Sequence, residues 1–343
     1  MKAVVIYEHG GVDKLKYEEI LAPEVRGNEV LVEVKACAMN HLDVWIRNGL
    51  PHLKLKYPHV LGTDVAGIVA KLGDDVRGIE IGTSVLVSPA ITCGRCFHCL
   101  SGRDNLCREL KILGENHSGG CCEYISVPKE NLIPMPQNVS FEEGASIPVV
   151  FHTAWHMLLD RAGIRPGEVV LVHAAGSGVG IAAIQVAKLF GATVITTAGS
   201  DEKVEKAKTV LGADHAINYR KQDFLSEVKK ITQRRGVDVI IDHTGVANWE
   251  KNILALTAGG RMVVCGSTSG YEAKTDLRHV FFRNLSILGS TLGSKGELYE
   301  IVKQFELGRL KPVVHKILPM SQAAEGHRII EDRDVFGKIV LVP

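Results

Sequence analysis

The sequence predicts an α/β protein of two domains, one β-rich and one built on a doubly wound parallel sheet. Three observations predict this fold class. A strand, a glycine-rich turn, a helix and a second strand follow one another within residues 168–203. Strand-like and helical segments then alternate as far as about residue 290,. The first 130 residues, by contrast, show strand-like runs separated by turn signals, without regular helices between them,.

The stretch 168–203 is the strongest single signal. Its apolar run Val169–Val172 is typical of a strand buried on both faces,. Small residues in the following turn let the backbone approach a ligand closely, and the next helix offers free N–H groups to a pyrophosphate. The alternative is that the glycines serve packing alone. The predicted cofactor-binding residues of the turn are Ala175, Gly176, Ser177, Gly178, Val179 and Gly180.

The α/β alternation sets the domain limits. Ser140 and Glu143 have capping-box spacing, which predicts a helical approach over 141–162 to the first strand of the sheet,. Further strands are expected at 193–197, 237–241, 261–265 and 285–289, and helices at 181–190, 202–211, 224–232, 249–256 and 296–307. The tail returns to β character. We therefore expect a nucleotide-binding domain at 131–294 and a first domain of 1–130 completed by 295–343.

Four of the eight cysteines crowd together before the end of the first domain. Cys93, Cys96, Cys99 and Cys107 have C-x2-C-x2-C-x7-C spacing, which can close a tetrahedron of thiolates around one zinc ion,. Four protein ligands leave no open position, so the predicted site is structural. An iron–sulfur cluster and four unliganded thiols are the alternatives.

Composition excludes several classes of protein. The chain has 343 residues, 45% of them hydrophobic, and a formal net charge of +1. Such a balance argues against a dedicated nucleic-acid or membrane-surface binder. No apolar run is long enough to span a bilayer, and the N-terminus shows no signal-peptide pattern,. We expect a cytoplasmic protein whose partner is a small-molecule substrate.

Together these motifs resemble the medium-chain dehydrogenase/reductase superfamily. The resemblance rests on the glycine-rich turn, the four-cysteine lobe, Leu211–Asp214, the strand 237–242 and Gly259-Gly260-Arg261. It covers essentially the whole chain. It implies a GroES-like catalytic domain, a Rossmann domain, a nicotinamide cofactor, and homodimers or homotetramers joined through the strand around 285–290.

The chain departs from the zinc alcohol dehydrogenases of that superfamily at the catalytic metal. Asn40 stands where the first cysteine ligand is expected, Thr63 replaces the histidine and Asp64 the glutamate. An apolar stretch, 147–150, lies near the third ligand position, and Leu42 replaces the hydroxyl residue of the proton relay. Asn and Thr are poor zinc ligands. Quinone- and enone-reductase-like members share the asparagine and lack the catalytic zinc.

The resemblance therefore implies an oxidoreductase that transfers hydride to an activated acceptor of the enone or quinone type. Asn40 is expected to orient the nicotinamide ribose or a substrate oxygen, His41 to touch phosphate and Asp43 to brace the loop. One alternative is an alcohol dehydrogenase with an absent or rearranged catalytic zinc. The candidate ligands for such a site are His41, Asp43, His59, Asp64 and His152. A non-enzymatic NADPH-binding sensor is the alternative of another class.

The end of the second strand bears on the choice of cofactor. An acidic residue there binds the ribose 2′-hydroxyl of NAD, but this chain has Ala198,. Ser200 and Lys203 follow, and Arg220 is expected nearby, a set of hydroxyl and cations that suits a 2′-phosphate,. The sequence thus favours NADP(H), with NAD(H) as the alternative.

Overall fold

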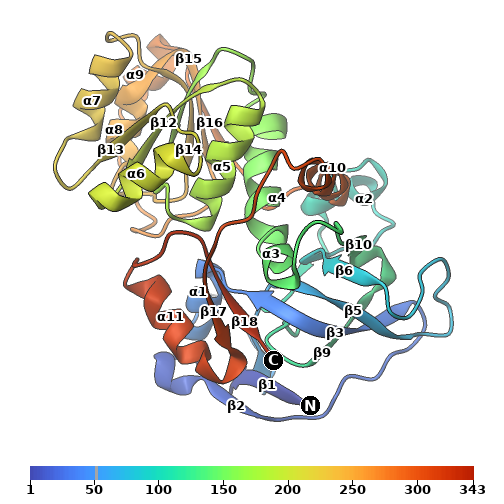
Figure 1. Ribbon diagram of the computed structural model, residues 1–343. Coiled ribbons are helices and arrows are strands. Elements are labelled where there is room, and N and C mark those ends of the chain that lie inside the picture. The colour runs from blue at the N-terminus through green and yellow to red at the C-terminus, as the bar shows by residue number, and fades with distance from the viewer. Residues whose placement is uncertain (51–52) are drawn as a thin grey trace. The chain divides into compact units, whose positions relative to one another are not determined.

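A computed structural model describes residues 1–50 and 53–343 (Figure 1). The chain forms two compact units, Met1–Val149 with Ser294–Pro343, and Val150–Gly293. The predicted limit at residue 131 thus differs from the division at 149. The reason is packing: α3 (Phe141–Ala145) contacts β3 (Glu29–Ala38) and β5 (Asp64–Leu72), which are strands of the first unit.

The first unit is built on a seven-stranded sheet, as the β-rich first domain predicts. Six of its strands run in the order β10-β6-β5-β3-β18-β17, and β9 pairs with β3. A three-stranded sheet, β2-β1-β4, and a two-stranded pair, β7-β8, complete it. Besides β3 and β5, the strands are β1 (Lys2–Ile6), β2 (Lys16–Glu19), β4 (His59–Val60), β6 (Ser84–Val87), β7 (Ala90–Ile91), β8 (Lys111–Ile112), β9 (Tyr124–Pro128), β10 (Leu132–Pro134), β17 (Val314–Pro319) and β18 (Lys338–Val342).

Helices of the first unit lie at the ends of its strands. They are α1 (His41–Asn48), α2 (Phe97–Leu100), α3, α10 (Lys295–Glu306) and α11 (Ala323–Glu331), with short 3₁₀ turns at Val12–Lys14, Asp104–Leu106, Lys129–Asn131 and Met320–Gln322. The sequence did not predict α1 or α11, because short amphipathic helices between strands are hard to tell from loops. The two helices contact each other. A buried arginine of α1, Arg47, pairs there with Glu331 of α11 at 2.5 Å.

The second unit confirms the doubly wound parallel sheet. Its strand order is β13-β12-β11-β14-β15-β16, with all neighbours parallel and helices on both faces. The strands are β11 (Val169–Val172), β12 (Thr193–Ala198), β13 (His215–Asn218), β14 (Val237–Asp242), β15 (Leu256–Val264) and β16 (Ser286–Gly289). The helices are α4 (Pro148–His156), α5 (Gly178–Leu189), α6 (Asp201–Thr209), α7 (Phe224–Ile231), α8 (Trp249–Ala255) and α9 (Leu277–Phe282).

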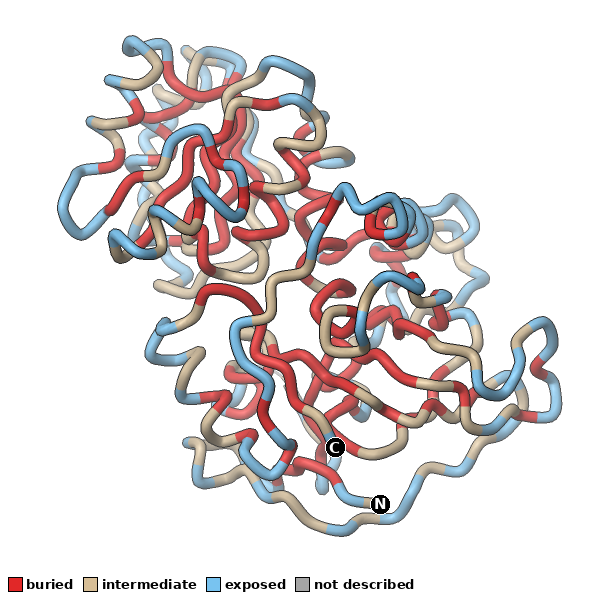
Figure 2. Tube along the Cα trace, viewed as in Figure 1, coloured by how far each residue is buried: buried red, intermediate tan, exposed pale blue. Residues whose placement is uncertain are grey.

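The order of the strands reverses between β11 and β14, which places the switch point at the carboxyl end of β11,. The central strands are buried on both faces, as their apolar runs predict (Figure 2). The sequence did not predict β13, whose four residues include His215 and Asn218.

The predicted helical approach over 141–162 is interrupted. Ser140 and Glu143 form the predicted capping box, with Glu143 N–H donating to Ser140 Oγ at 3.3 Å. α3 ends at Ala145, because Pro148 cannot continue a helix and instead begins α4,. A π-helical turn, Met157–Arg161, follows α4. Among the described residues, no helix is long and apolar enough to cross a membrane.

Candidate functional site

The predicted site residues fall into four groups, each contained within one unit. The glycine-rich turn and the end of β12 belong to the second unit. The four-cysteine lobe and the loop that leads into α1 belong to the first. Each group is built up separately below.

The predicted nucleotide loop joins β11 to α5 at the switch point. Ala174 adopts a left-handed φ of +52°, which turns the chain sharply after the strand,. Ser177 is the N-cap of α5, and its Oγ accepts a hydrogen bond from Gly180 N–H at 2.9 Å. The N–H groups of Gly178 and Val179, in the first turn of the helix, have no intrahelical partner,.

Close backbone contact explains one glycine of this loop. A Cβ on Gly180 would lie 2.2 Å from the carbonyl oxygen of Ala174. The Ser177 hydroxyl donates to the same carbonyl oxygen at 2.8 Å, so its single hydrogen is used,. His243 Nε2, 2.9 Å from Ser177 Oγ, must therefore be the donor in that contact. The hydrogen bonds of Ser177 thus fix the conformation of the loop. The N–H groups at the start of α5 remain available to an anion.

A chain of hydrogen bonds supports the loop from below. Asn252 Nδ2 donates to Asp242 Oδ2 at 3.2 Å, so its Oδ1 accepts from His173 Nε2 at 2.7 Å. His173 Nδ1 then accepts from the Thr197 hydroxyl at 3.1 Å, and Thr197 Oγ1 in turn accepts from Ala174 N–H at 3.2 Å,. Burial lowers the pKa of His173, which favours the neutral ring that this chain of bonds requires. Sequence reasoning missed these side chains, because no spacing pattern links three strands and a helix.

Three of the residues expected to bind a 2′-phosphate, Ala198, Ser200 and Arg220, lie near the end of β12. Ser200 caps α6, its Oγ accepting from Lys203 N–H at 3.2 Å. Ala198 pairs in register with Asn218, which carries Arg220 to the same edge of the sheet. A Cβ on Gly199 would lie 2.7 Å from the Tyr219 hydroxyl and 3.6 Å from Arg220 Nε.

The acidic residue nearest this edge is already paired. Lys221 Nζ and Asn218 Nδ2 both donate to the carboxylate of Asp201, and the bond to Lys221 holds the pKa of that carboxyl below its usual range. Its negative charge is therefore offset by a neighbouring cation.

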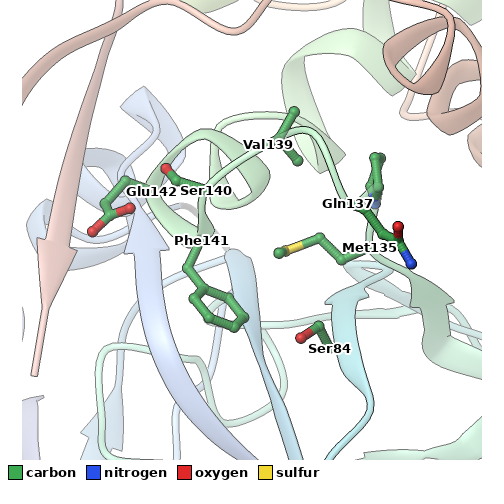
Figure 3. A pocket seen from close by; sticks show the side chains of 8 residues that line it. Ser84, Met135, Gln137, Val139, Ser140, Phe141 and Glu142 are labelled. Carbon is green, nitrogen blue, oxygen red and sulfur yellow. The ribbon is translucent and has the colours of Figure 1, made fainter.

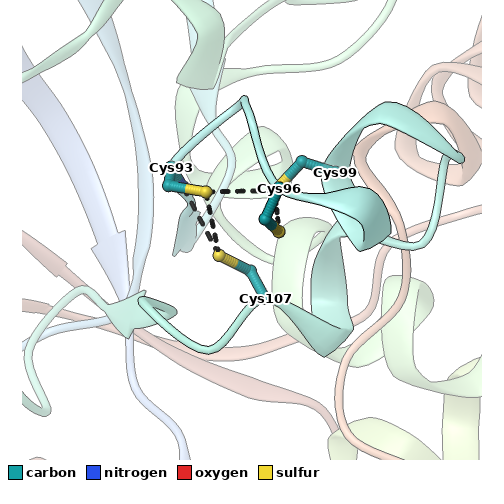
Figure 4. Close-up of side chains that lie close together, drawn as sticks. All are labelled: Cys93, Cys96, Cys99 and Cys107. Atoms are coloured by element: carbon teal, nitrogen blue, oxygen red, sulfur yellow. Dashed lines mark hydrogen bonds between the residues drawn. The ribbon is translucent and has the colours of Figure 1, made fainter.

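The four cysteines of the predicted lobe converge, as Figure 4 shows. Their sulfur atoms all lie within 4.8 Å of one another. The Sγ–Sγ distances are 3.5 Å for Cys96–Cys99, 3.6 Å for Cys93–Cys107 and 3.8 Å for Cys93–Cys99. A tetrahedron with zinc–sulfur bonds of about 2.3 Å has edges of about 3.8 Å. The donor set and its dimensions therefore fit a single structural metal ion.

The loop leading into α1 forms a second polar cluster, in the first unit. Lys338 of β18 donates from Nζ to Asn40 Oδ1 at 2.6 Å and to Asp64 Oδ2 at 2.9 Å. Asn40 Nδ2 donates to the same Asp64 oxygen at 2.9 Å. The other oxygen of Asp64 accepts from Val149 N–H at 2.7 Å. We call Asn40, Asp64 and Lys338 the ammonium cluster.

Asp43 fixes the backbone of this loop. Its Oδ2 accepts from Asn40 N–H at 2.7 Å and its Oδ1 from Gly62 N–H at 3.0 Å. Burial raises the pKa of the carboxyl to about 6, although both backbone N–H groups oppose that shift. Both carboxylate oxygens thus accept hydrogen bonds from backbone N–H groups, and the bracing role of Asp43 stays a prediction.

His41 begins α1 and is half-buried. Its ring meets Trp45 edge-on, with 5.0 Å between the ring centroids. Burial, and then the nearby charge of Arg333, lower the pKa of His41, which favours its neutral form. A neutral imidazole can donate one hydrogen bond to a phosphate but brings no full charge.

The residues proposed for a rearranged catalytic metal do not form a site. Among the described residues, the one group of three or more ligating side chains within metal-binding reach is the four-cysteine lobe. His59 Nε2 contacts the carbonyl oxygen of Gly114 at 2.9 Å, and Asp43 and Asp64 are engaged as described above. Thr63 Oγ1 is buried and has no hydrogen-bond partner among the described residues. The donor atoms needed by a catalytic zinc are therefore occupied or unsuited.

A pocket of about 340 Å³ lies elsewhere in the first unit (Figure 3). Phe141 and Met135 contribute its apolar wall. None of the predicted site residues lines it. The lining residues are Ser84, Met135, Pro136, Gln137, Val139, Ser140, Phe141 and Glu142.

In the first unit, sequence reasoning missed Lys338. It is a lysine at the start of a buried strand, Lys338–Val342, and its side chain is only 5% exposed. A buried lysine requires a partner, so a lone lysine in an apolar strand is the signal that predicts a buried ion pair. The sequence could not name Asp64 as that partner, because 274 residues separate the two.

Comparison with known proteins agrees with this architecture. Residues 26–137 match the family model of the alcohol dehydrogenase GroES-like domain, and residues 178–306 match that of the zinc-binding dehydrogenases. The GroES-like expectation for the first domain is thus confirmed.

Relatives match over the full length of the chain. Human quinone oxidoreductase is 31% identical over 100% of this chain and 98% of its own length. An NAD-dependent alcohol dehydrogenase of Sulfurisphaera tokodaii is 32% identical over 100% of both chains. The crystal structure of another NAD-dependent alcohol dehydrogenase is 50% identical and superposes with a TM-score of 0.97, covering 100% of both chains. Full-length matches to oxidoreductases support an enzyme, and with the two domains they show that the chain belongs to the medium-chain dehydrogenase/reductase superfamily.

Proposed function

We propose that the protein is an NADP(H)-dependent oxidoreductase that transfers hydride to a small activated acceptor of the enone or quinone type. The observation that carries the proposal is the ammonium cluster. Where zinc alcohol dehydrogenases hold a Lewis acid, Lys338 Nζ, Asn40 and Asp64 bond to one another. Without a metal to stabilise an alkoxide, a conjugated acceptor is the better substrate, because its own π system takes up the charge.

The chain's own residues supply positioning in this reaction. The reduced nicotinamide supplies the hydride when the cofactor is bound. The first turn of α5 would hold the pyrophosphate, since Gly178 and Val179 offer free N–H groups there,. Asn40 would donate to an oxygen of the substrate or of the nicotinamide ribose, and the neutral His41 to a phosphate oxygen. Asp43 holds the loop that carries both.

Three features support NADP(H) over NAD(H). Position 198, where NAD-binding proteins have an acidic residue, is an alanine. The charge of Asp201 is offset by Lys221. Ser200, Tyr219 and Arg220 lie close together at one edge of the sheet. Arg220→Ala is expected to raise the Kd of NADPH about 10-fold and to leave that of NADH unchanged, because one charged phosphate contact is lost. Lys208→Ala, on the last turn of α6, is the matched control. Equal Kd values of the wild-type protein for NADPH and NADH would contradict the preference.

Alcohol dehydrogenase activity is the second candidate. It is favoured by the 50% identity to a solved alcohol dehydrogenase. Metal analysis separates the two functions, because the proposed one requires about one zinc per chain, held by the four cysteines. Two zinc ions per chain, or faster oxidation of alcohols than reduction of enones and quinones by the purified protein, would favour the second candidate.

We further propose a homodimer or homotetramer in the cytoplasm. β16 is the last strand of its sheet, so one of its edges is unpaired among the residues that the structure describes,. Exposed apolar residues accompany it: Phe281, Phe282 and Ile287 are 58%, 75% and 38% exposed. The cysteines are free thiols, as suits a reducing compartment,. Sedimentation equilibrium of the wild-type protein and of Ile287→Lys tests the assembly, with a monomeric variant expected.

A further inference from the structure

The polar groups of Asn40 make hydrogen bonds, except for one hydrogen of its side-chain amide. Its backbone N–H donates to Asp43, its Oδ1 accepts from Lys338, and its Nδ2 donates to Asp64. Two strands of the first unit, β18 and β5, thus meet at one amide side chain, and Asp43 fixes the backbone that carries it. Such complete fixation exceeds what the N-cap of an eight-residue helix requires,.

The orientation of this amide follows from chemistry. A lysine ammonium has donors and no acceptor, so the atom 2.6 Å from Lys338 Nζ must be the amide oxygen,. Nδ2 then faces Asp64, and one of its two hydrogens is used there. The second Nδ2 hydrogen has no partner in the part of the chain that the structure describes.

Burial decides which member of the cluster can meet a ligand. The Lys338 and Asp64 side chains are 5% and 0% exposed, whereas Asn40 is half-buried. A ligand that reaches the cluster therefore meets the Asn40 amide first. It finds an N–H donor there, because the oxygen is turned toward the ammonium.

The same arrangement disfavours a metal ion. Asn40 Oδ1 and both oxygens of Asp64 are occupied by donors, and a positive charge already lies among them. Thr63, between Gly62 and Asp64, offers one hydroxyl, a poor zinc ligand,. A catalytic zinc at these residues does not fit.

We infer that Lys338 is a positioning residue that turns the Asn40 amide so that its Nδ2–H binds the carbonyl oxygen of the acceptor, and that its ammonium stands in place of a catalytic metal. The inference rests on the proposed function. Hydride addition to the β-carbon of an enone shifts the C=C electron pair into a new bond between the α-carbon and the carbonyl carbon and the C=O π pair onto the oxygen. A solvent proton then adds to the α-carbon, and the C=O bond reforms. The Asn40 N–H bonds the resulting enolate oxygen more strongly than the ketone.

A double-mutant cycle in kcat/KM for 2-cyclohexen-1-one tests this. Asn40→Ala is expected to lower kcat/KM about 100-fold, mostly through kcat, because one donor to the developing oxyanion is lost. Lys338→Met should lower it about 10-fold in the wild-type background but less than about 3-fold beside Asn40→Ala, because Lys338 acts through Asn40. Equal losses in both backgrounds would overturn the inference.

Two further variants separate positioning from folding. Asp64→Asn with Lys338→Met removes both buried charges, which keeps the fold free of an unpaired carboxylate. Its kcat should stay as low as that of Lys338→Met, and wild-type kcat in this double variant would contradict the proposed role of Lys338. Lys316→Met, on β17 beside β18, removes an exposed lysine and should leave kcat/KM unchanged.

A readout without turnover keeps the inference separate from the proposed function. In protein labelled with nitrogen-15 only at asparagine, the signals of the Asn40 side-chain NH₂ are identified by their loss in Asn40→Asp. They are expected to lie away from free-amide positions and to move toward them in Lys338→Met. Free-amide positions in the wild-type protein would overturn the inference even if enones are reduced. If enones are not reduced but the signals behave as expected, the proposed function fails while the fixation of Asn40 by Lys338 stands.

Discussion

Two polar clusters of the first unit balance their negative charge in different ways. The four-cysteine lobe gathers donors and holds no cation of its own; its sulfur atoms lie within 4.8 Å of one another. The ammonium cluster carries its cation covalently, as Lys338, which Asn40 and Asp64 surround. The first arrangement is stable when an external ion neutralises the thiolates, whereas the second needs none.

The difference follows from how each cluster is assembled along the chain. In the lobe, all four ligands lie within 15 residues, so loop geometry alone brings them together. The ammonium cluster joins the end of β3, the start of β5 and the start of β18. There Lys338 supplies the positive charge between the strands, 2.9 Å from the carboxylate of Asp64.

The largest expected effect is loss of the lobe's metal. Cys96→Ser should remove most of the zinc, near one ion per chain in the wild-type protein, and lower the Tm, because structural zinc contributes about 10 kcal/mol or more in small domains. Inductively coupled plasma analysis and calorimetry measure both. Cys265→Ser, in the second unit, is the control and should keep the metal. Zinc retained in full by Cys96→Ser would remove the contrast between the clusters.

The next effect concerns the built-in cation. Lys338→Met should lower the free energy of unfolding by about 3–5 kcal/mol, because Asp64 is left as an uncompensated buried charge,. Replacing both partners, by Asp64→Asn with Lys338→Met, should cost less. Urea unfolding at low and high salt measures both costs, which should be nearly independent of salt because the pair is buried. If the single and double variants lose the same free energy of unfolding, then Lys338 does not stabilise the protein by neutralising Asp64.

Much of the fold could be predicted from the sequence, because local patterns determine it. The apolar run Val169–Val172, the capping residue Ser140 and the four-cysteine spacing each act within one element or one loop. α11 was missed between β17 and β18, where the chain was expected to stay β-like. The helix is amphipathic, but its nine residues span only two to three turns, too short a segment for periodicity to distinguish a helix from a loop between strands,.

In the candidate site, the local contacts could be predicted from the sequence, but the contacts between distant segments could not. Asn40 and Asp43 lie three residues apart, and their capping geometry is local. The partner that defines the chemistry of Asn40, Lys338, comes from 298 residues away. Likewise, His173 meets Asn252 across 79 residues. Long-range polar contacts of this kind leave no periodic trace, and the sequence signals only that a lysine stands in an apolar strand.

The smallest expected effect is the pH dependence of stability that Asp43 causes. Unlike Asp64, Asp43 forms no ion pair with Lys338. Burial raises the pKa of Asp43 to about 6 in the folded protein, against about 3.9 in the unfolded chain,. Between those values the folded state holds the proton more tightly, so the free energy of unfolding falls as pH rises from about 4 to about 6, by about 3 kcal/mol in all. Below that window the carboxyl is protonated in both states, and above it the carboxyl is ionised in both.

Asp43→Asn removes this titration. The difference in free energy of unfolding between variant and wild type should therefore shift by about 3 kcal/mol in favour of the variant between pH 4 and pH 7. Urea unfolding at half-unit pH steps measures the difference, in which zinc release from the lobe cancels because both proteins contain the lobe. The asparagine also lowers the free energy of unfolding by an amount that does not depend on pH. Its amide has one acceptor oxygen, whereas Asn40 N–H and Gly62 N–H each need one,. A difference that does not change with pH would mean that Asp43 titrates near its ordinary pKa, and that hydration or the two backbone donors outweigh its burial.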